Sequence, residues 1–185
     1  MKKIILASKS PRRKELLGRI IKDFECVTSD VPEIKLERSE SPHLLVMENA
    51  AIKAKDVFKS YNDCTVIGAD TVVVLDGEIL GKPKDKQQAK QMLCAIRGRQ
   101  HEVYTGIYII NANKEFKSFE KTVVTFGDMT DSEIEDYINS GEPMDKAGAY
   151  GIQGSGSIYI KGIEGDYYNV VGLPLYSLKN ALKYF

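Results

Sequence analysis

A dense run of β-forming residues over 65–75 contains a single acid, Asp70. Residues 65–69 and 71–75 both have the composition of buried strands, because Val, Ile and Thr pack well on a pleated surface. An ionised aspartate is almost never fully buried without a partner. We therefore expect Asp70 at a strand end or at a bulge beside Gly68, with its carboxylate pointing into a cleft. The functional interpretation is a general base or metal ligand, and the structural one is an aspartate bonded to backbone amides.

The remaining pattern predicts an α/β fold with a mixed, twisted central sheet flanked by helices. Asp76 and Gly77 form a turn signal that joins the run to 78–80 as a hairpin, so a mixed sheet is favoured over a purely parallel one. Further strands are expected over 4–7, 24–28, 101–110, 117–127 and 157–163. Helices are expected from Pro11, over 42–61, from Asp85 to Gly98, from Thr130 to Gly141 and from Leu173. Loops are expected over 29–42 and 141–157.

The charges of the chain balance, with 26 Lys and Arg against 26 Asp and Glu in 185 residues. A polyanion-binding protein usually carries a basic surplus, so we expect no nucleic-acid partner and look for local anion sites. Apolar residues make up 43%, which is typical of a globular protein, and we expect one domain over 1–185. The apolar run 4–7 is too short for a signal peptide and no stretch could cross a bilayer, so we expect a cytoplasmic protein without a membrane partner.

Metal chemistry based on cysteine or histidine is disfavoured. Cys26, Cys64 and Cys94 are widely spaced and form no CxxC pair, and the chain has only two histidines, His43 and His101. We therefore expect buried, reduced thiols and no zinc site, and we interpret His101 as structural.

The segment 8–13, Ser-Lys-Ser-Pro-Arg-Arg, lies between the first expected strand and the first expected helix. Unpaired backbone N–H groups at a helix N-terminus favour anions. Arg12 and Arg13 have the wrong charge for that position, which indicates that a bound phosphate compensates for them, aided by the amides after Ser8. The alternative is that both arginines pair with surface acids.

Two lysines and a glutamine are further candidates. Lys82 precedes Pro83, which forces it into an extended conformation that could project toward phosphates, and Lys53 lies close to the apolar face of the 42–61 helix. Solvated surface lysines are the alternative. Gln153 lies in the glycine-rich stretch 141–156 and could read a base edge, unless that stretch is an ordinary flexible loop.

These segments, taken together, resemble the Maf family of nucleoside triphosphate pyrophosphatases. The resemblance covers essentially the whole chain, through SKSPRRKELL, NAAIKA, GADTVV, GKP, GRQHEVYTG, TVVTF, SGEPMDKAGAYGIQG and GDYYNVVGLPL. It implies two lobes around a nucleotide cleft, in a fold related to that of inosine triphosphate pyrophosphatases, and a homodimer. It also implies hydrolysis of a nucleoside triphosphate to the monophosphate and pyrophosphate with a divalent cation, Mg²⁺ or Mn²⁺. The family was first associated with inhibition of septum formation.

The resemblance assigns roles to individual positions. The substrate-binding positions fall on Ser8, Arg12, Arg13, Thr71 and Gln153. Asp70 falls on the proton acceptor, and Lys53 and Lys82 on the lysines of the KA and GKP motifs. The acidic loop residue is Glu33, which with Asp70 would hold the cation.

Arg12, Thr71 and Gln153 are similar to the residues of the subgroup that hydrolyses dTTP and UTP. The alternatives are a pyrophosphatase for 7-methyl-GTP or modified purine nucleotides, and a non-catalytic nucleotide-binding regulator of septum formation. Two positions depart from the family's pattern: Asn49 stands where Leu is frequent, and Arg97 where Ser is common. We expect neither to touch the chemistry, although Asn49 could alter the packing behind Lys53.

Overall fold

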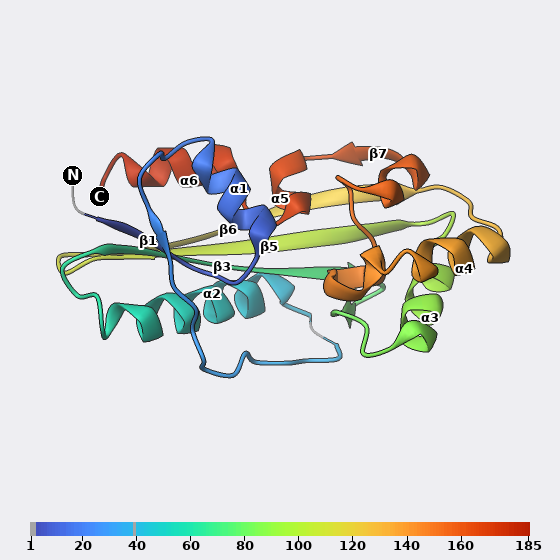
Figure 1. Ribbon diagram of the computed structural model, residues 1–185, viewed down its shortest axis with the longest axis horizontal. Coiled ribbons are helices and arrows are strands. Elements are labelled where there is room, and N and C mark those ends of the chain that lie inside the picture. Colours follow the sequence, from blue (N-terminus) through green and yellow to red (C-terminus); the bar gives the residue numbers. More distant parts are fainter. Residues whose placement is uncertain (1–2, 39) are drawn as a thin grey trace.

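A mixed seven-stranded sheet runs through the length of the molecule (Figure 1). The structure is a computed structural model that describes residues 3–38 and 40–185; residue 39, in the loop expected over 29–42, lies outside the described residues. The strands are β1 (Ile4–Ala7), β2 (Glu25–Cys26), β3 (Thr65–Leu75), β4 (Glu78–Leu80), β5 (Gln100–Ile110), β6 (Glu115–Phe126) and β7 (Ile160–Glu164). The α-helices are α1 (Pro11–Gly18), α2 (Pro42–Phe58), α3 (Lys86–Ile96), α4 (Asp131–Asn139), α5 (Tyr167–Val171) and α6 (Leu175–Leu182).

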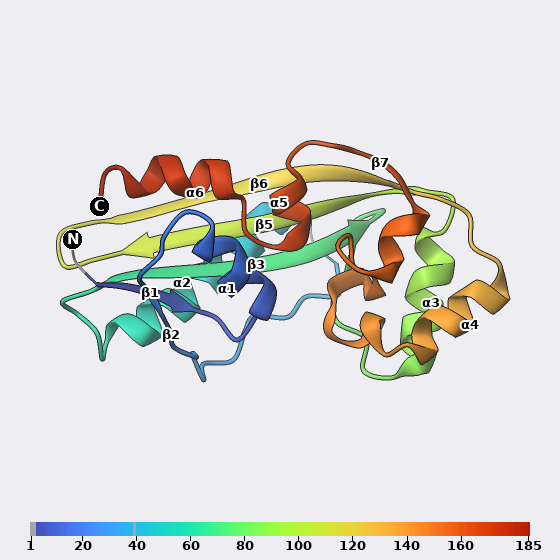
Figure 2. The ribbon, with the colours of Figure 1, turned by 45° about the horizontal axis from the view of Figure 1, so that its top comes forward.

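The sheet has the order β2-β1-β3-β5-β6-β7, with β4 added beside β3. β1 pairs in parallel with β2 and β3, whereas β3, β5, β6 and β7 pair antiparallel, so the expected mixed sheet is confirmed. Helix α2 covers one face, and α1, α5 and α6 cover the other (Figure 2). Helices α3 and α4 pack around the far end, where β3, β5 and β6 extend into a second half of the molecule.

Strand β3 is continuous through Asp70, and the expected strand end or bulge beside Gly68 is wrong. Its pairing with β5 runs without a shift from Val66 to Val74 and sets Asp70 opposite Gly106. The opposite edge of β3 is interrupted instead. There the pairing with β1 ends at Gly68, and the pairing with β4 begins at Val73. Among the described residues, no strand pairs with that edge over 69–72. This gap opens the middle of the sheet to a ligand.

Two glycines bring α2 unusually close to the sheet. A Cβ on Gly68 would lie 2.1 Å from the carbonyl oxygen of Ala50, and one on Gly106 would lie 2.5 Å from that of Val46. Both neighbours are α2 backbone, which cannot turn aside as a side chain can. The close approach sets the buried face of α2 directly against Asp70.

We expect Gly68→Ala to lower the free energy of unfolding by roughly 1–3 kcal/mol or more, because an overpacked interface must shift backbone. Urea denaturation followed by circular dichroism measures the loss. Gly162→Ala is the matched control, because Gly162 is also in a strand and a methyl group added there would have no atom within 4 Å. Equal stability of the two variants would contradict this account of the α2 contact.

Several sequence expectations are confirmed and others are corrected. Asp85 and Thr130 cap α3 and α4, the latter with the capping box to Glu133. Residues 155–159 form a 3₁₀ helix before β7. The helix expected from Leu173 is confirmed as α6, and α5 is an additional short helix before it. Of the strand expected over 24–28, only β2, Glu25–Cys26, is present. Of the three thiols expected to be buried, only that of Cys64 is buried; Cys26 is exposed and Cys94 is partly buried.

Candidate active site

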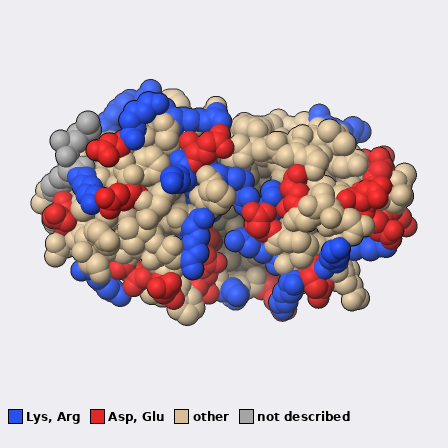
Figure 3. Space-filling view, viewed as in Figure 1, with Lys and Arg blue, Asp and Glu red and all other residues tan. Residues whose placement is uncertain are grey.

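A cleft of about 620 Å³ lies at the interrupted edge of β3, between the two halves of the molecule. A second hollow, of about 570 Å³, reaches Ser8 and shares much of its lining with the first. Figure 3 shows Lys and Arg side chains gathered around this central hollow, with acidic side chains beside them. The predicted residues that line one or both spaces are Ser8, Arg12, Arg13, Glu33, Lys53, Asp70, Thr71, Lys82 and Gln153. The expected cleft therefore exists, and all of the predicted site residues lie on it.

Asp70 is only 7% exposed, and both of its carboxylate oxygens are bound by side chains of α2. Oδ1 accepts a hydrogen bond from Lys53 Nζ at 2.7 Å, and Oδ2 accepts one from Asn49 Nδ2 at 3.1 Å. A buried ionised carboxylate requires such partners. The alternative of an aspartate held by backbone amides does not describe this site.

The ammonium group of Lys53 joins two acids. Its Nζ lies 2.7 Å from Glu33 Oε1 and 2.7 Å from Asp70 Oδ1, and it also donates to the backbone oxygen of Ala69 at 3.3 Å. These contacts use all three N–H donors of a lysine. Lys53 is 9% exposed, so the alternative of a solvated surface lysine is wrong.

Glu33 lies on the loop that precedes α2 and reaches the same lysine from the solvent side. Partial burial would raise the pKa of Glu33, but the hydrogen bond and charge of Lys53, with Lys82 and Arg13 nearby, outweigh it and hold the pKa below its usual value. Glu33 is therefore a carboxylate at neutral pH. Two negative charges and one positive charge meet at this point of the cleft.

Asn49 was not predicted to take part, and that expectation is wrong. Its side-chain amide contacts Asp70 directly and also bonds to the backbone of Ile34, next to Glu33. The sequence signalled Asn49 only as a departure from the pattern that the chain resembles. Its contacts depend on the tertiary approach of α2 to β3, which no local pattern reveals.

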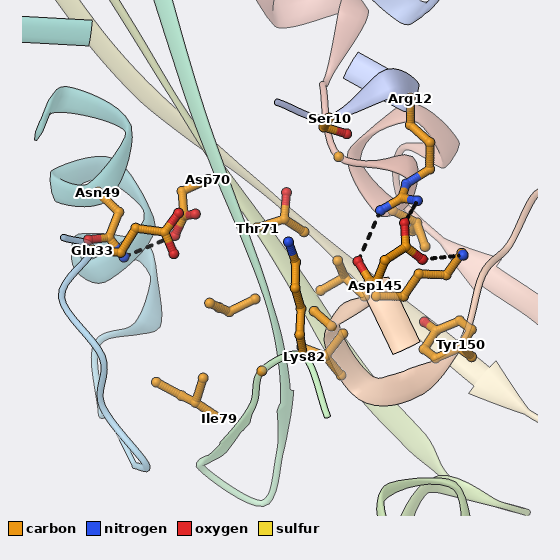
Figure 4. Close-up of a pocket in the computed structure, with 18 of the residues that line it drawn as sticks. Ser10, Arg12, Glu33, Asn49, Asp70, Thr71, Ile79, Lys82, Asp145 and Tyr150 are labelled. Atoms are coloured by element: carbon orange, nitrogen blue, oxygen red, sulfur yellow. Dashed lines mark hydrogen bonds and ion pairs between the residues drawn. The ribbon is translucent and has the colours of Figure 1, made fainter. Parts of the chain in front are cut away.

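The first turn of α1 presents Arg12 to the cleft. Ser10 caps the helix, its Oγ accepting from Arg13 N at 3.4 Å, and Ser8 Oγ accepts from Ser10 N at 3.2 Å. Arg12 Nη1 lies 2.7 Å from Asp145 Oδ2, across the cleft in the glycine-rich segment (Figure 4). Burial tends to raise the pKa of Asp145, but Lys146 and Arg12 outweigh it and lower the pKa to about 2. Arg12 therefore pairs with an acid in the structure, as the alternative for this residue predicted. The sequence reasoning did not single out Asp145.

Arg13 belongs to a partly buried hydrogen-bond chain. Its Nε donates to Gly172 O at 2.8 Å and its Nη2 to Thr71 Oγ1 at 2.9 Å. Thr71 and Thr105 hydroxyl oxygens lie 2.9 Å apart, and Thr105 donates its hydrogen to Asn169 O. Since a hydroxyl has one hydrogen, Thr71 donates to Thr105 and keeps only an acceptor lone pair for a further partner.

Two further residues of the cleft, Lys82 and Gln153, have side chains without a protein partner among the described residues. The ammonium group of Lys82 extends into the cleft toward Thr71 (Figure 4). Neither Lys82 nor Gln153 makes a side-chain hydrogen bond or ion pair within the part of the chain that the structure describes. Both residues are exposed, and their side chains are therefore available to a ligand.

Tyr150 also lines the cleft and was not singled out in the sequence. Its hydroxyl lies 2.7 Å from Nε2 of His101, which is buried and lies behind it. Burial lowers the pKa of His101 to about 4, so the imidazole is neutral at pH 7. His101 supports the wall of the cleft and does not line it.

The fold and the site together define a mixed α/β protein with an open cleft in which lysine and arginine side chains surround a pair of carboxylates. The family model described as "Maf-like protein" matches residues 3–185. The chain belongs to the Maf family.

Two relatives agree with this assignment, and one solved structure shares the fold. The chain is 51% identical over 185 residues to a dTTP/UTP pyrophosphatase of Bacillus cereus strain G9842. The match covers 100% of this chain and 96% of that protein. It is 50% identical, with the same coverage, to the dTTP/UTP pyrophosphatase of Bacillus cereus strain B4264. The Ham1 protein of Staphylococcus aureus has a similar fold, with a TM-score of 0.59, 16% identity and 98% of each chain covered.

Proposed function

We propose that this protein hydrolyses nucleoside triphosphates, preferably dTTP and UTP, to the monophosphate and pyrophosphate. The observation that carries the proposal is the meeting of Asp70, Glu33 and Lys53 in a cleft that also holds Arg12 and Lys82. The names of relatives at 50–51% identity over the whole chain support the choice of substrate.

The cations of the cleft would neutralise the triphosphate. Lys82 has no partner among the described residues, and Arg12 is held by a half-exposed acid that a more highly charged phosphate group can displace. Phosphoryl transfer depends mainly on position and charge neutralisation, and side chains that lie within one cleft supply both.

Asp70 would accept the proton of the attacking water. Water adds to the α-phosphorus, the bond from that phosphorus to the bridging oxygen breaks, and pyrophosphate leaves. Oδ1 is the oxygen of Asp70 that would take up the proton. Oδ2 is bound by Asn49, whereas Oδ1 is bound by a flexible lysine. Lys53 would turn from Asp70 and Glu33 toward the phosphates when the nucleotide binds.

A divalent cation, Mg²⁺ or Mn²⁺, fits the donor set at Glu33 and Asp70. One oxygen of each lies 2.7 Å from the same Lys53 nitrogen, so the two carboxylates converge. Over residues 3–38 and 40–185 no three His, Cys, Asp or Glu side chains form a metal cage. Mg²⁺ commonly needs only one or two carboxylates and takes its other ligands from phosphate and water. When bound, such a cation offsets phosphate charge and lowers the pKa of water.

Thr71 and Gln153 would select the base. Thr71 has only an acceptor to offer, and the ring N3–H of uracil and thymine is a donor, whereas N3 of cytosine carries no hydrogen. The amide of Gln153 could donate to a ring carbonyl. A polar reader of this kind discriminates strongly, because the wrong base leaves it unpaired.

The test is pyrophosphate release from dTTP, UTP, CTP, GTP, ATP and 7-methyl-GTP with Mg²⁺ or Mn²⁺. We expect dTTP and UTP to be hydrolysed at least about 100-fold more efficiently than CTP and the purines. Faster hydrolysis of 7-methyl-GTP or another purine would contradict the substrate assignment. Binding without any pyrophosphate release would favour a non-catalytic regulator of septum formation.

We also propose that the protein acts as a cytoplasmic homodimer and does not bind nucleic acid. The balanced charge supports the last point. Among the helices of the described residues, none is long and apolar enough to span a membrane. Size-exclusion chromatography with light scattering measures the oligomeric state.

A further inference from the structure

Asn49 occupies a particular place on α2, one turn before Lys53 and on the same face. It is 2% exposed, and a buried amide is costly unless its polar atoms are bonded. Its contacts account for both N–H donors and the carbonyl oxygen. All of them lead to segments that carry the two acids of the cleft.

The first set of contacts fixes the loop that carries Glu33. Asn49 Oδ1 accepts from Ile34 N at 2.8 Å, and Nδ2 donates to Ile34 O at 3.0 Å. The side chain thus bonds to Ile34 on both of its backbone groups, much as a neighbouring strand would. The loop has another tether to α2, where Ser29 Oγ donates to Asp56 Oδ2 at 2.9 Å, but among the described residues neither Ser29 nor Asp56 bonds to Glu33 or Asp70.

The other contact holds Asp70, as Nδ2 also donates to Oδ2 of its carboxylate at 3.1 Å. Lys53 binds the same two acids by charge, but a lysine can leave for a phosphate group. A neutral amide lacks that option and remains in place. Once Lys53 has left for a phosphate group, Asn49 still links the Glu33 loop to Asp70.

We propose that Asn49 is a positioning residue that holds Asp70 and the Glu33 loop in a fixed relation while Lys53 moves to the substrate. This inference rests on the proposed hydrolysis. Asn49 acts through its bonds to Asp70 and to the loop that carries Glu33.

The test uses Asn49→Leu, which removes all three hydrogen bonds, and Asn49→Asp, which keeps the acceptor for Ile34 N and removes both donors. We expect kcat for dTTP to fall about 10-fold or more in Asn49→Leu and further in Asn49→Asp, which adds a charge beside Asp70. Binding of α,β-imido-dUTP, measured by calorimetry, should change less than about threefold, because the polar atoms of the amide are already engaged with Ile34 and Asp70. Amide hydrogen exchange at residues 33–35 should rise in Asn49→Leu.

Ser29→Ala is the matched control, since it cuts the other tether of the same loop without touching either acid. We expect its kcat to stay within about twofold of the parent protein. The inference is overturned if Asn49→Leu retains kcat within twofold, or if Ser29→Ala loses as much as Asn49→Leu does. Circular dichroism checks that each variant is folded. If Asn49→Leu does not fold, the kcat of Asn49→Asp tests the inference in its place. A parent protein that releases no pyrophosphate from any nucleotide would instead contradict the proposed function.

Discussion

Asp70→Asn is expected to lower kcat for dTTP at least about 100-fold. The amide has the volume of the carboxylate but cannot take up a proton from water, and the buried charge that pairs with Lys53 is removed. Binding should survive, because the cations that would hold the phosphates are unchanged. Pyrophosphate release gives the rate, and calorimetry with α,β-imido-dUTP gives the affinity.

Asp76→Asn is the matched control for this variant. Asp76 is exposed at the β3–β4 turn and pairs with Arg99, away from the cleft. We expect no loss of rate beyond about twofold, as for most surface substitutions. If Asp70→Asn turned over dTTP at a near-normal rate with binding retained, Asp70 would be removed from the mechanism.

Lys53→Met is expected to combine a loss of activity with a loss of stability. The thioether has similar length but leaves the charge of Asp70 buried and facing Glu33 with only Asn49 to bind it. Breaking a buried ion pair from one side costs about 3–5 kcal/mol, and we expect a loss near the lower value because Glu33 is half exposed. We expect kcat/KM to fall at least about 100-fold, since a phosphate-neutralising group is lost as well.

Two further variants separate these effects. Lys55→Met removes a lysine from the exposed side of α2, where it contacts Glu115 and the Tyr108 ring, and should change neither quantity much. The double variant Lys53→Met with Asp70→Asn should regain much of the stability, because no buried charge is left alone, but none of the activity. A stable, inactive Lys53→Met single variant would show that the ion pair contributes little to folding.

The alternation of strands and helices could be predicted because local chemistry decides it. The turn at Asp76 and Gly77 and the caps at Asp85 and Thr130 are signals carried by a few adjacent residues. The course of β3 through Asp70 could not be predicted in this way. A buried acid is tolerated in mid-strand only because Lys53 and Asn49 reach it from α2, and Gly68 lets α2 approach.

The same distinction holds for the site. Asp70, Arg12 and Arg13 stood out in their local settings, whereas the role of Glu33 came only from the family resemblance. The structure brings these residues to one cleft. Their pairings were not recognisable. Arg12 binds Asp145, which is 133 positions away, and Arg13, on the same helix, reaches Gly172 and Thr71. Such contacts are set by the tertiary fold, so no spacing in the sequence reports them.

The unbroken course of β3, β5 and β6 limits how this molecule can respond to a nucleotide. A hinge between the halves would have to bend the ladder that pairs β3 with β5 from Val66 to Val74, directly beneath the cleft. Adjustment on binding is therefore left to the rim: the 29–38 loop, the start of α1 and the segment around Asp145. We therefore expect β3 and β5 to keep their pairing when a nucleotide binds, and the ordering entropy to be lost by a few rim side chains instead of by domain closure.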